Sequence, residues 1–439
     1  MKVYFASLGC DKNLVDSEHM LADISKEYEI VNDPCECDIA VVNTCAFIKD
    51  AKEESINTIL ELSELKKQNL KFLVMTGCLA QRYHDDLKEL MPEVDAYVGI
   101  SAINNILDDL KKLKKNRKIV DMPDNNLAQN ASGDRFLTPP FHYSYLKIAE
   151  GCDKNCTYCA IPSIRGRYRS IPMEELIKEA EYLAHNYISE IILVAQETTV
   201  YGTDIYGKKS IVELVEKLSA IEGIRWIRLM YCYPEEIDDD LISLIKNNTK
   251  VCKYLDLPIQ HASDRILQKM GRRTSGKDIE DLIKKLRKEI PNIALRTSLI
   301  AGFPTEEEED FEKLVRFVKK CKFDRLGVFT YSKEEGTLAA SFKGQIRADV
   351  KKKRQKALMD VQKEISLKRN SKMISKIYDA VIDGYDSAEG CLVARLQYDA
   401  PDIDGCVFIE SDKEIMSGTF VKVRITDYSE YDLIGEITE

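Results

Sequence analysis

Short apolar runs alternate with amphipathic stretches over residues 1–116 of the chain. Apolar runs bounded by turn residues are typical of buried parallel strands, whereas apolar residues spaced three and four apart indicate helices. Helices are expected at 14–26 and 50–66. The pattern predicts a small doubly wound α/β domain, with strands at 2–8, 38–43, 71–76 and 95–99.

The same alternation resumes after a polar, turn-rich segment at 120–140, which we interpret as an interdomain linker. Six strand–helix units follow, too few for the closed eight-fold barrel, so we expect an open (β/α)6 partial TIM barrel. This second domain is placed at 138–367, and a basic helical stretch at 347–370 connects it to the last domain. Strands are expected at 144–149, 190–195, 225–231, 253–258, 293–299 and 325–330, and helices at 173–187, 210–221, 235–247, 276–289 and 306–320.

From residue 370 to 438 the apolar period changes to two, which is typical of strands with one buried face. Five short strands in a row predict a small antiparallel β-barrel resembling an OB fold. The complete chain is therefore expected to be a multidomain α/β protein that ends in this barrel. The five strands are expected at 376–383, 391–396, 404–410, 418–427 and 433–437.

The chain of 439 residues has the composition of a soluble globular protein of two to four domains. No apolar run reaches the roughly 18 residues that a membrane helix needs, and the N-terminus lacks the features of a signal peptide. Its 13 cysteines are odd in number and are not spaced like those of a disulfide-rich secreted scaffold. We therefore expect a cytoplasmic enzyme in which reduced thiols bind metal.

Three of these cysteines, Cys152, Cys156 and Cys159, have the spacing Cys-x3-Cys-x2-Cys. Three thiolates hold three irons of a [4Fe–4S] cluster and leave the fourth iron open to another ligand, which marks a cluster that takes part in chemistry. The alternative is structural zinc, which needs a fourth ligand and usually a second Cys-x2-Cys or a His pair. No such pair follows within 70 residues, so the spacing favours iron–sulfur.

A second set of cysteines follows three successive predicted strands: Cys10, Cys45 and Cys78. Because sites in open α/β sheets lie beyond the carboxyl ends of the strands, these three thiols would converge on one edge and could hold a second cluster. The alternative is that they are ordinary buried cysteines. Cys35 and Cys37 precede the second strand, at the opposite end of the sheet, and are not expected to be ligands.

The net charge of −10 is concentrated at the C-terminal end, where residues 373–439 contain 15 acidic and 5 basic residues. Such a segment is a poor nucleic-acid binder, because neutralising phosphates requires Lys and Arg. It suits a basic protein partner, or it serves solubility alone.

Several segments resemble a known family. The cysteine spacing with Tyr158 before the last cysteine resembles the signature of radical S-adenosylmethionine enzymes. Nearly the whole chain is similar to the methylthiotransferase family among them, and within it to the branch that modifies a ribosomal protein, whose last domain is a TRAM domain. The segments that carry the resemblance are Ser7–Glu18, Val42-Asn-Thr-Cys-Ala46, Thr76-Gly-Cys78, Asp399-Ala-Pro-Asp-Ile-Asp-Gly405 and Tyr431-Asp-Leu-Ile-Gly435.

This resemblance implies two [4Fe–4S] clusters and S-adenosylmethionine as cofactors. Cys152, Cys156 and Cys159 would hold the cluster that reduces S-adenosylmethionine, and Cys10, Cys45 and Cys78 an auxiliary cluster that carries the sulfur. The implied reaction places a methylthio group on the β-carbon of an aspartate in small-subunit ribosomal protein twelve, free or in the ribosome. An electron donor such as flavodoxin is implied, and no membrane. The alternatives are the same chemistry on a tRNA adenosine, against which the acidic C-terminal region argues, and an iron–sulfur electron carrier without chemistry of its own.

The resemblance also indicates cofactor contacts outside the cysteines. Gln196 and Glu197 end the second barrel strand, where the superfamily places groups that bind the amino group of the cofactor; the alternative is a solvated loop pair. Arg296 lies within the fifth strand and is a candidate for the cofactor carboxylate. Tyr158 is a further candidate for cofactor binding. The segment that begins at Gly302 could bring backbone near the adenosine, or it could equally be a helix entry with a proline at the turn. The basic run that begins at Arg165 could meet an acidic substrate segment or be solvated.

Overall fold

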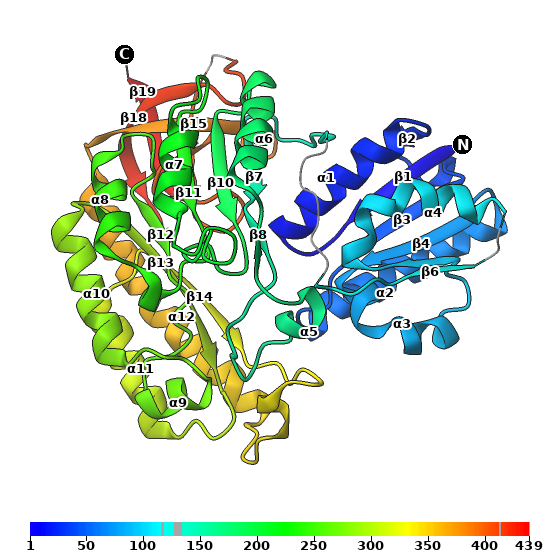
Figure 1. Ribbon diagram of the computed structural model, residues 1–439. Coiled ribbons are helices and arrows are strands. Elements are labelled where there is room, and N and C mark those ends of the chain that lie inside the picture. The colour runs from blue at the N-terminus through cyan, green and yellow to red at the C-terminus, as the bar shows by residue number, and fades with distance from the viewer. Residues whose placement is uncertain (116–117, 127–133, 412–413, 439) are drawn as a thin grey trace.

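The computed structural model describes residues 1–115, 118–126, 134–411 and 414–438, which form three parts (Figure 1). An α/β part comes first, a barrel of parallel strands follows, and a small β-barrel ends the chain. The predicted boundary at residue 116 and residues 127–133 of the predicted linker lie outside the described residues. No helix among the described residues is both long and apolar enough to span a membrane.

The N-terminal part is a six-stranded, fully parallel sheet in the order β2-β1-β3-β4-β5-β6. Its central strands are apolar on both faces because α2 and α3 pack on one side and α1 and α4 on the other. The predicted doubly wound domain is confirmed, and two short edge strands add to it. The elements are β1 Lys2–Ser7, α1 Asp11–Ser25, β2 Glu29–Val31, β3 Ile39–Thr44, α2 Lys49–Ser63, β4 Phe72–Gly77, α3 Cys78–Leu90, β5 Ala96–Val98, α4 Ile106–Leu113 and β6 Ile119–Asp121.

The central part has six parallel strands in two sheets, β11-β10-β7 and β12-β13-β14, which a single bridge between Ile227 and Val251 joins. Among the described residues β7 and β14 do not pair, so the predicted (β/α)6 barrel is open on that side. The strands are β7 Tyr143–Lys147, β10 Glu190–Val194, β11 Trp226–Leu229, β12 Tyr254–Asp256, β13 Ala294–Ala301 and β14 Arg325–Thr330.

Helices cover the outside of this barrel and bury its main core. Capping boxes begin two of them, Ser275 with Asp278 at α10 and Glu307 with Asp310 at α11, which accounts for the acidic start of the predicted 306–320 helix. The helices are α6 Met173–His185, α7 Ile211–Ser219, α8 Asp239–Asn247, α9 Asp264–Lys269, α10 Gly276–Glu289, α11 Glu308–Cys321 and α12 Ala348–Asn370; the shorter β8 Ala149–Glu150, α5 Ile161–Arg165 and β9 Arg169–Ser170 lie in the loop after β7.

The C-terminal part is a closed five-stranded barrel in the order β15-β16-β17-β19-β18. One pair differs from the predicted antiparallel arrangement, because β17 and β19 run parallel, with Val407 opposite Leu433. An alternating pattern shows which face of a strand is buried but not the direction of its partner. The strands are β15 Ile377–Asp386, β16 Cys391–Leu396, β17 Val407–Ile409, β18 Phe420–Tyr428 and β19 Leu433–Thr438.

This small barrel docks on the amino ends of the central strands. Arg395 pairs with Glu190 at the start of β10 at 2.7 Å, and the Tyr254 hydroxyl at the start of β12 donates to Asp404 at 2.7 Å. At the start of β14, Arg325 Nε donates to Asp399 at 2.8 Å. Asp399 and Asp404 of the C-terminal region are therefore committed to contacts within the chain, and the carboxyl ends of the barrel strands stay clear for a site.

The N-terminal domain bridges the open side of the central barrel. On one side Asp16 of α1 pairs with Lys147 at the end of β7. On the other side Glu334, after β14, pairs with Lys52 at 2.8 Å and with Arg82 at 3.0 Å. The carboxyl edge of the N-terminal sheet is thereby brought over the carboxyl ends of the barrel strands.

Candidate functional site

Cys10, Cys45 and Cys78 lie at the carboxyl ends of β1, β3 and β4, which are neighbours in the sheet. Gly9, with φ of +94°, allows their close approach, since a Cβ there would fall 2.8 Å from Cβ of Cys45. Burial raises the pKa of the Cys78 thiol to about 12, and the neighbouring sulfurs of Cys10 and Cys45 act in the same direction. Three thiols placed in this way, with Cys45 and Cys78 buried and Cys10 partly buried, suit a metal centre, because a coordinated metal offsets the cost of the thiolates.

The Cys-x3-Cys-x2-Cys loop follows β8, at the carboxyl end of the first barrel strand. The amides of Lys154 and Ile161 donate to the sulfurs of Cys152 and Cys159, both at 3.4 Å. Thr157 anchors the loop to the end of α9, where its amide and hydroxyl donate to backbone carbonyls. Amide donors directed at sulfur stabilise thiolates, so the loop fits a bound cluster.

Within the part of the chain that the structure describes, no three His, Cys, Asp or Glu side chains surround a single point as ligands of one metal ion would. A [4Fe–4S] cluster does not need that arrangement, because each cysteine binds a different iron. Cys35 and Cys37 lie before β3, at the amino edge of the sheet and away from the other cysteines of this domain, as predicted.

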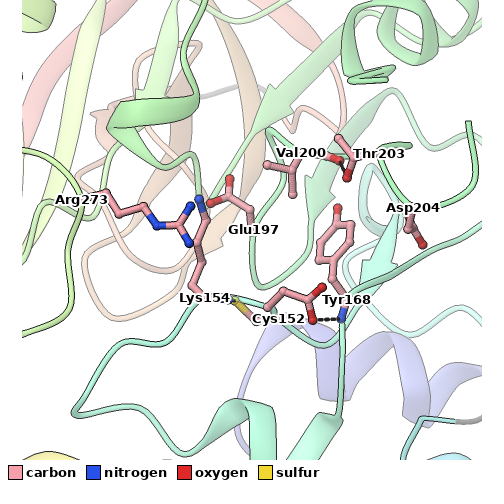
Figure 2. A pocket seen from close by; sticks show the side chains of 9 residues that line it. Cys152, Lys154, Tyr168, Glu197, Val200, Thr203, Asp204 and Arg273 are labelled. Atoms are coloured by element: carbon pink, nitrogen blue, oxygen red, sulfur yellow. Dashed lines mark hydrogen bonds between the residues drawn. The ribbon is translucent and has the colours of Figure 1, made fainter. Parts of the chain in front are cut away.

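A cavity of about 360 Å³ opens beside Cys152, and Figure 2 shows the side chains of Glu197, Lys154 and Tyr168 gathered around it. Glu197 is 1% exposed; its Oε1 accepts from Thr199, while its Oε2 has no hydrogen-bond partner among the described residues. Burial raises the pKa of Glu197 to about 7. A buried carboxylate oxygen without a partner fits a cationic group in this cavity.

Gln196, the other predicted residue of this pair, points elsewhere. Its Nε2 donates to Oε1 of Glu150 at 2.8 Å, two residues before Cys152. The two residues therefore have different roles: Glu197 lines the cavity, whereas Gln196 hydrogen-bonds to the segment that leads into the cysteine loop.

Tyr158 and Gly302 lie near each other. The Tyr158 ring packs edge-on against Phe303, with ring centroids 6.4 Å apart. Gly302 has φ of +75°, and a Cβ there would fall 2.4 Å from Cγ of Lys351 on α12. The Phe303 side chain, which follows Gly302, thus packs against the aromatic side chain of the cysteine loop, and a contact of this region with the adenosine stays a prediction.

Arg296 is not brought together with these residues. Its guanidinium pairs with Asp256 at 2.9 Å and with Asp404 of the C-terminal barrel at 3.4 Å. Two carboxylates already satisfy its charge, so this position favours fastening of the C-terminal barrel over binding of a cofactor carboxylate. The sequence pattern could not show either partner.

A buried charge network that the sequence reasoning missed lies between the two cysteine sets. Arg165, interpreted from the sequence as substrate-facing or solvated, is 2% exposed and pairs with Glu150 at 2.7 Å. Lys147 pairs with Glu150 at 3.0 Å and also with Asp16. Although burial alone raises the pKa of Glu150, Arg165 and Lys147 hold it well below its usual range. The sequence signal that could have indicated this network was a charged residue, Asp16, on the buried side of α1.

Three family models match the chain. The Radical SAM superfamily matches residues 146–318, the Uncharacterized protein family UPF0004 matches residues 2–99, and the TRAM domain matches residues 374–438. The first match covers most of the open barrel and the Cys152 loop, and the second covers most of the sheet that bears Cys10, Cys45 and Cys78.

Curated relatives match over the full length. The "Ribosomal protein uS12 methylthiotransferase RimO" of Lachnoclostridium phytofermentans is 55% identical over 437 residues, 99% of each chain. The protein of the same name from Acetivibrio thermocellus is 51% identical, covering 99% of this chain and 98% of that one.

Solved structures share the fold at low identity. The radical S-adenosylmethionine methyltransferase TsrM from Kitasatospora setae has a TM-score of 0.57 at 15% identity, covering 74% of this chain and 72% of that one. The cobalamin-dependent S-adenosylmethionine radical enzyme OxsB has a TM-score of 0.52 at 12% identity, covering 82% and 56%. At these identities the likeness concerns the fold alone.

Proposed function

This chain belongs to the ribosomal protein uS12 methylthiotransferase (RimO) family of radical S-adenosylmethionine enzymes, and we propose that it places a methylthio group on the β-carbon of an aspartate in uS12. The observation that carries the proposal is the convergence of two three-cysteine sets on one region between two domains, each at the carboxyl ends of parallel strands. The clusters of an electron carrier normally have all four irons filled, whereas two sets of three cysteines would each leave one iron open.

In this proposal Cys152, Cys156 and Cys159 hold one [4Fe–4S] cluster and Cys10, Cys45 and Cys78 hold the other. When bound, the first supplies the electron that splits S-adenosylmethionine, and the second supplies the sulfur of the methylthio group. Glu197 binds the amino group of S-adenosylmethionine through Oε2, and Tyr158 with the backbone at Gly302 packs near its adenosine. The proposal requires the two clusters to face one shared space, which would hold the reacting groups together.

The proposed partner is uS12, free or in the ribosome, and the proposed reductant is a protein such as flavodoxin, in the cytoplasm. The first test is mass spectrometry after anaerobic reconstitution with iron and sulfide, with S-adenosylmethionine, a reductant, and either uS12 or unmodified tRNA. A gain of about 46 Da, one hydrogen replaced by a methylthio group, is expected on an aspartate-containing peptide. The same gain on a tRNA nucleoside would reverse the choice of substrate, and iron-loaded protein that modifies neither would favour the electron-carrier alternative.

Glu197→Gln is expected to raise the KM for S-adenosylmethionine about 10- to 100-fold, because a hydrogen bond to a charged group contributes about 1.5–3 kcal/mol. Gln keeps an oxygen that accepts from Thr199 but removes the negative charge. Since the pKa of Glu197 is raised to about 7, its carboxylate becomes ionised as the pH rises through that value, and wild-type affinity should rise between about pH 6 and pH 8.

The measurement is the KM for S-adenosylmethionine of the iron-loaded enzyme across this pH range. Glu181→Gln, at an exposed position on α6, is the matched control and should leave both the KM and its pH dependence unchanged. An unchanged KM in Glu197→Gln would remove this residue from the cofactor site.

A further inference from the structure

Arg165 comes from the segment that follows the Cys152 loop and reaches the sulfur of Cys78 in the other cysteine set. It ends α5, six residues after Cys159, and reaches into the N-terminal domain. Its Nη1 donates to Glu150 at 2.7 Å and to Asp16 at 3.2 Å. Its Nη2 donates to Oδ1 of Asn13 and, at 3.6 Å, to the sulfur of Cys78. One buried guanidinium therefore has acceptors from both domains.

The two terminal nitrogens of this guanidinium, Nη1 and Nη2, have different acceptors. Two cations, Arg165 and Lys147, face two carboxylates, Asp16 and Glu150, so the network is balanced in charge without the cysteines. Glu150 is in turn held by Gln196. With Nη1 held by the carboxylates, the plane of the guanidinium is fixed and Nη2 is directed at Cys78.

Hydrogen bonds to a ligand sulfur stabilise the more negative, reduced state of an iron–sulfur cluster and so raise its reduction potential. Cys78 is also the first residue of α3, where the backbone amides of the first helical turn add positive charge. Arg165 directs a full positive charge at this same sulfur.

We propose that Arg165 is a positioning residue for the auxiliary cluster: it orients the sulfur of Cys78 and sets the reduction potential of the cluster that this sulfur binds. The inference rests on the proposed assignment of Cys10, Cys45 and Cys78 as cluster ligands. Because Arg165 and Glu150 flank the Cys152 loop in sequence, the segment that carries one cluster also tunes the other.

The test isolates the auxiliary cluster in the full-length chain by replacing Cys152, Cys156 and Cys159 with alanine. Bound iron and the reduction potential, followed by electron paramagnetic resonance, are compared with and without Arg165→Met. The Met variant keeps most of the side-chain length but removes the charge and the sulfur donor. We expect its potential to shift to a more negative value, since the reduced cluster loses stabilisation.

Arg165→Lys and Arg167→Met complete the series. Lysine keeps the charge but cannot serve the carboxylates and the sulfur with one rigid fork, so a smaller shift in the same direction is expected. Arg167 is exposed and pairs with Asp153, and its Met variant should keep the parent potential. If Arg165→Met does not retain iron, the reduction potential of Arg165→Lys tests the positioning role instead.

The outcomes separate the inference from the assignment on which it rests. A parent chain with Arg165 that binds no cluster after loss of the three loop cysteines would refute the assignment of Cys10, Cys45 and Cys78. A bound cluster whose potential is the same in the parent and in the Arg165 variants would refute the positioning role alone. A negative shift in the Arg165 variants and none in Arg167→Met supports the inference.

Discussion

Replacing Cys152 by alanine is expected to abolish methylthiolation and to lower bound iron from about eight to about four atoms per chain, because each [4Fe–4S] cluster holds four. Removing hydrogen from an unactivated carbon needs a radical, and no side-chain base of ordinary pKa can replace it. The sulfur of Cys152 also accepts the amide of Lys154 and lines the Glu197 cavity, so its loss affects the cofactor site itself. Iron analysis and product mass spectrometry measure both effects.

The matching change in the other set, Cys78→Ala, is expected to give the same iron loss with a different chemical signature. The cluster on the Cys152 loop stays bound, so cleavage of S-adenosylmethionine to 5′-deoxyadenosine should continue while methylthiolation stops. Cys321→Ala, at a buried position of α11, and Cys35→Ala, at an exposed one, are controls that should keep full iron and activity. Methylthiolation by Cys152→Ala would rule out the radical mechanism.

The largest expected effect on stability comes from Arg395→Met in the C-terminal barrel. Arg395 is 2% exposed and pairs with Glu190 at 2.7 Å and Asp383 at 3.1 Å. Removing one partner from a buried ion network leaves uncompensated charge and costs about 3–5 kcal/mol. Glu190 keeps its contact with Arg228 at 2.8 Å, but among the described residues Asp383 keeps only its hydrogen bond with His142.

Trp226, the single tryptophan of the chain, reports on this change because its ring packs edge-on against Phe420 of the C-terminal barrel, 4.9 Å between centroids. Urea unfolding followed by its fluorescence should show the transition of Arg395→Met at lower urea. Arg424→Met is the control: Arg424 forms an exposed pair with Glu436 in the same barrel and should change stability by less than about 1 kcal/mol. Equal stability of the two variants would mean that the docking does not depend on the buried ion network.

Much of the fold could be predicted because local patterns of apolar residues along the chain indicate its strands and helices. A buried parallel strand such as β3, with all six residues buried, stands out as a continuous apolar run. The edge strands β2 and β6 have three residues each and are partly exposed, so no such run marks them. The convergence of Cys10, Cys45 and Cys78 was also predictable, because parallel strands place their carboxyl ends at one edge of the sheet.

The sequence by itself determined the domain order, the two cysteine sets and the resemblance to a family, since each depends on spacing along the chain. Only the tertiary structure decided that Arg165 is buried against Cys78, that Arg296 fastens the C-terminal barrel, and that β17 pairs in parallel with β19. A buried charge is tolerated only where opposite charges meet it, and here one partner of each arginine, Asp16 for Arg165 and Asp404 for Arg296, comes from another domain. The periodicity of apolar residues does not indicate such contacts, because their free energy depends on how the folded domains pack against each other.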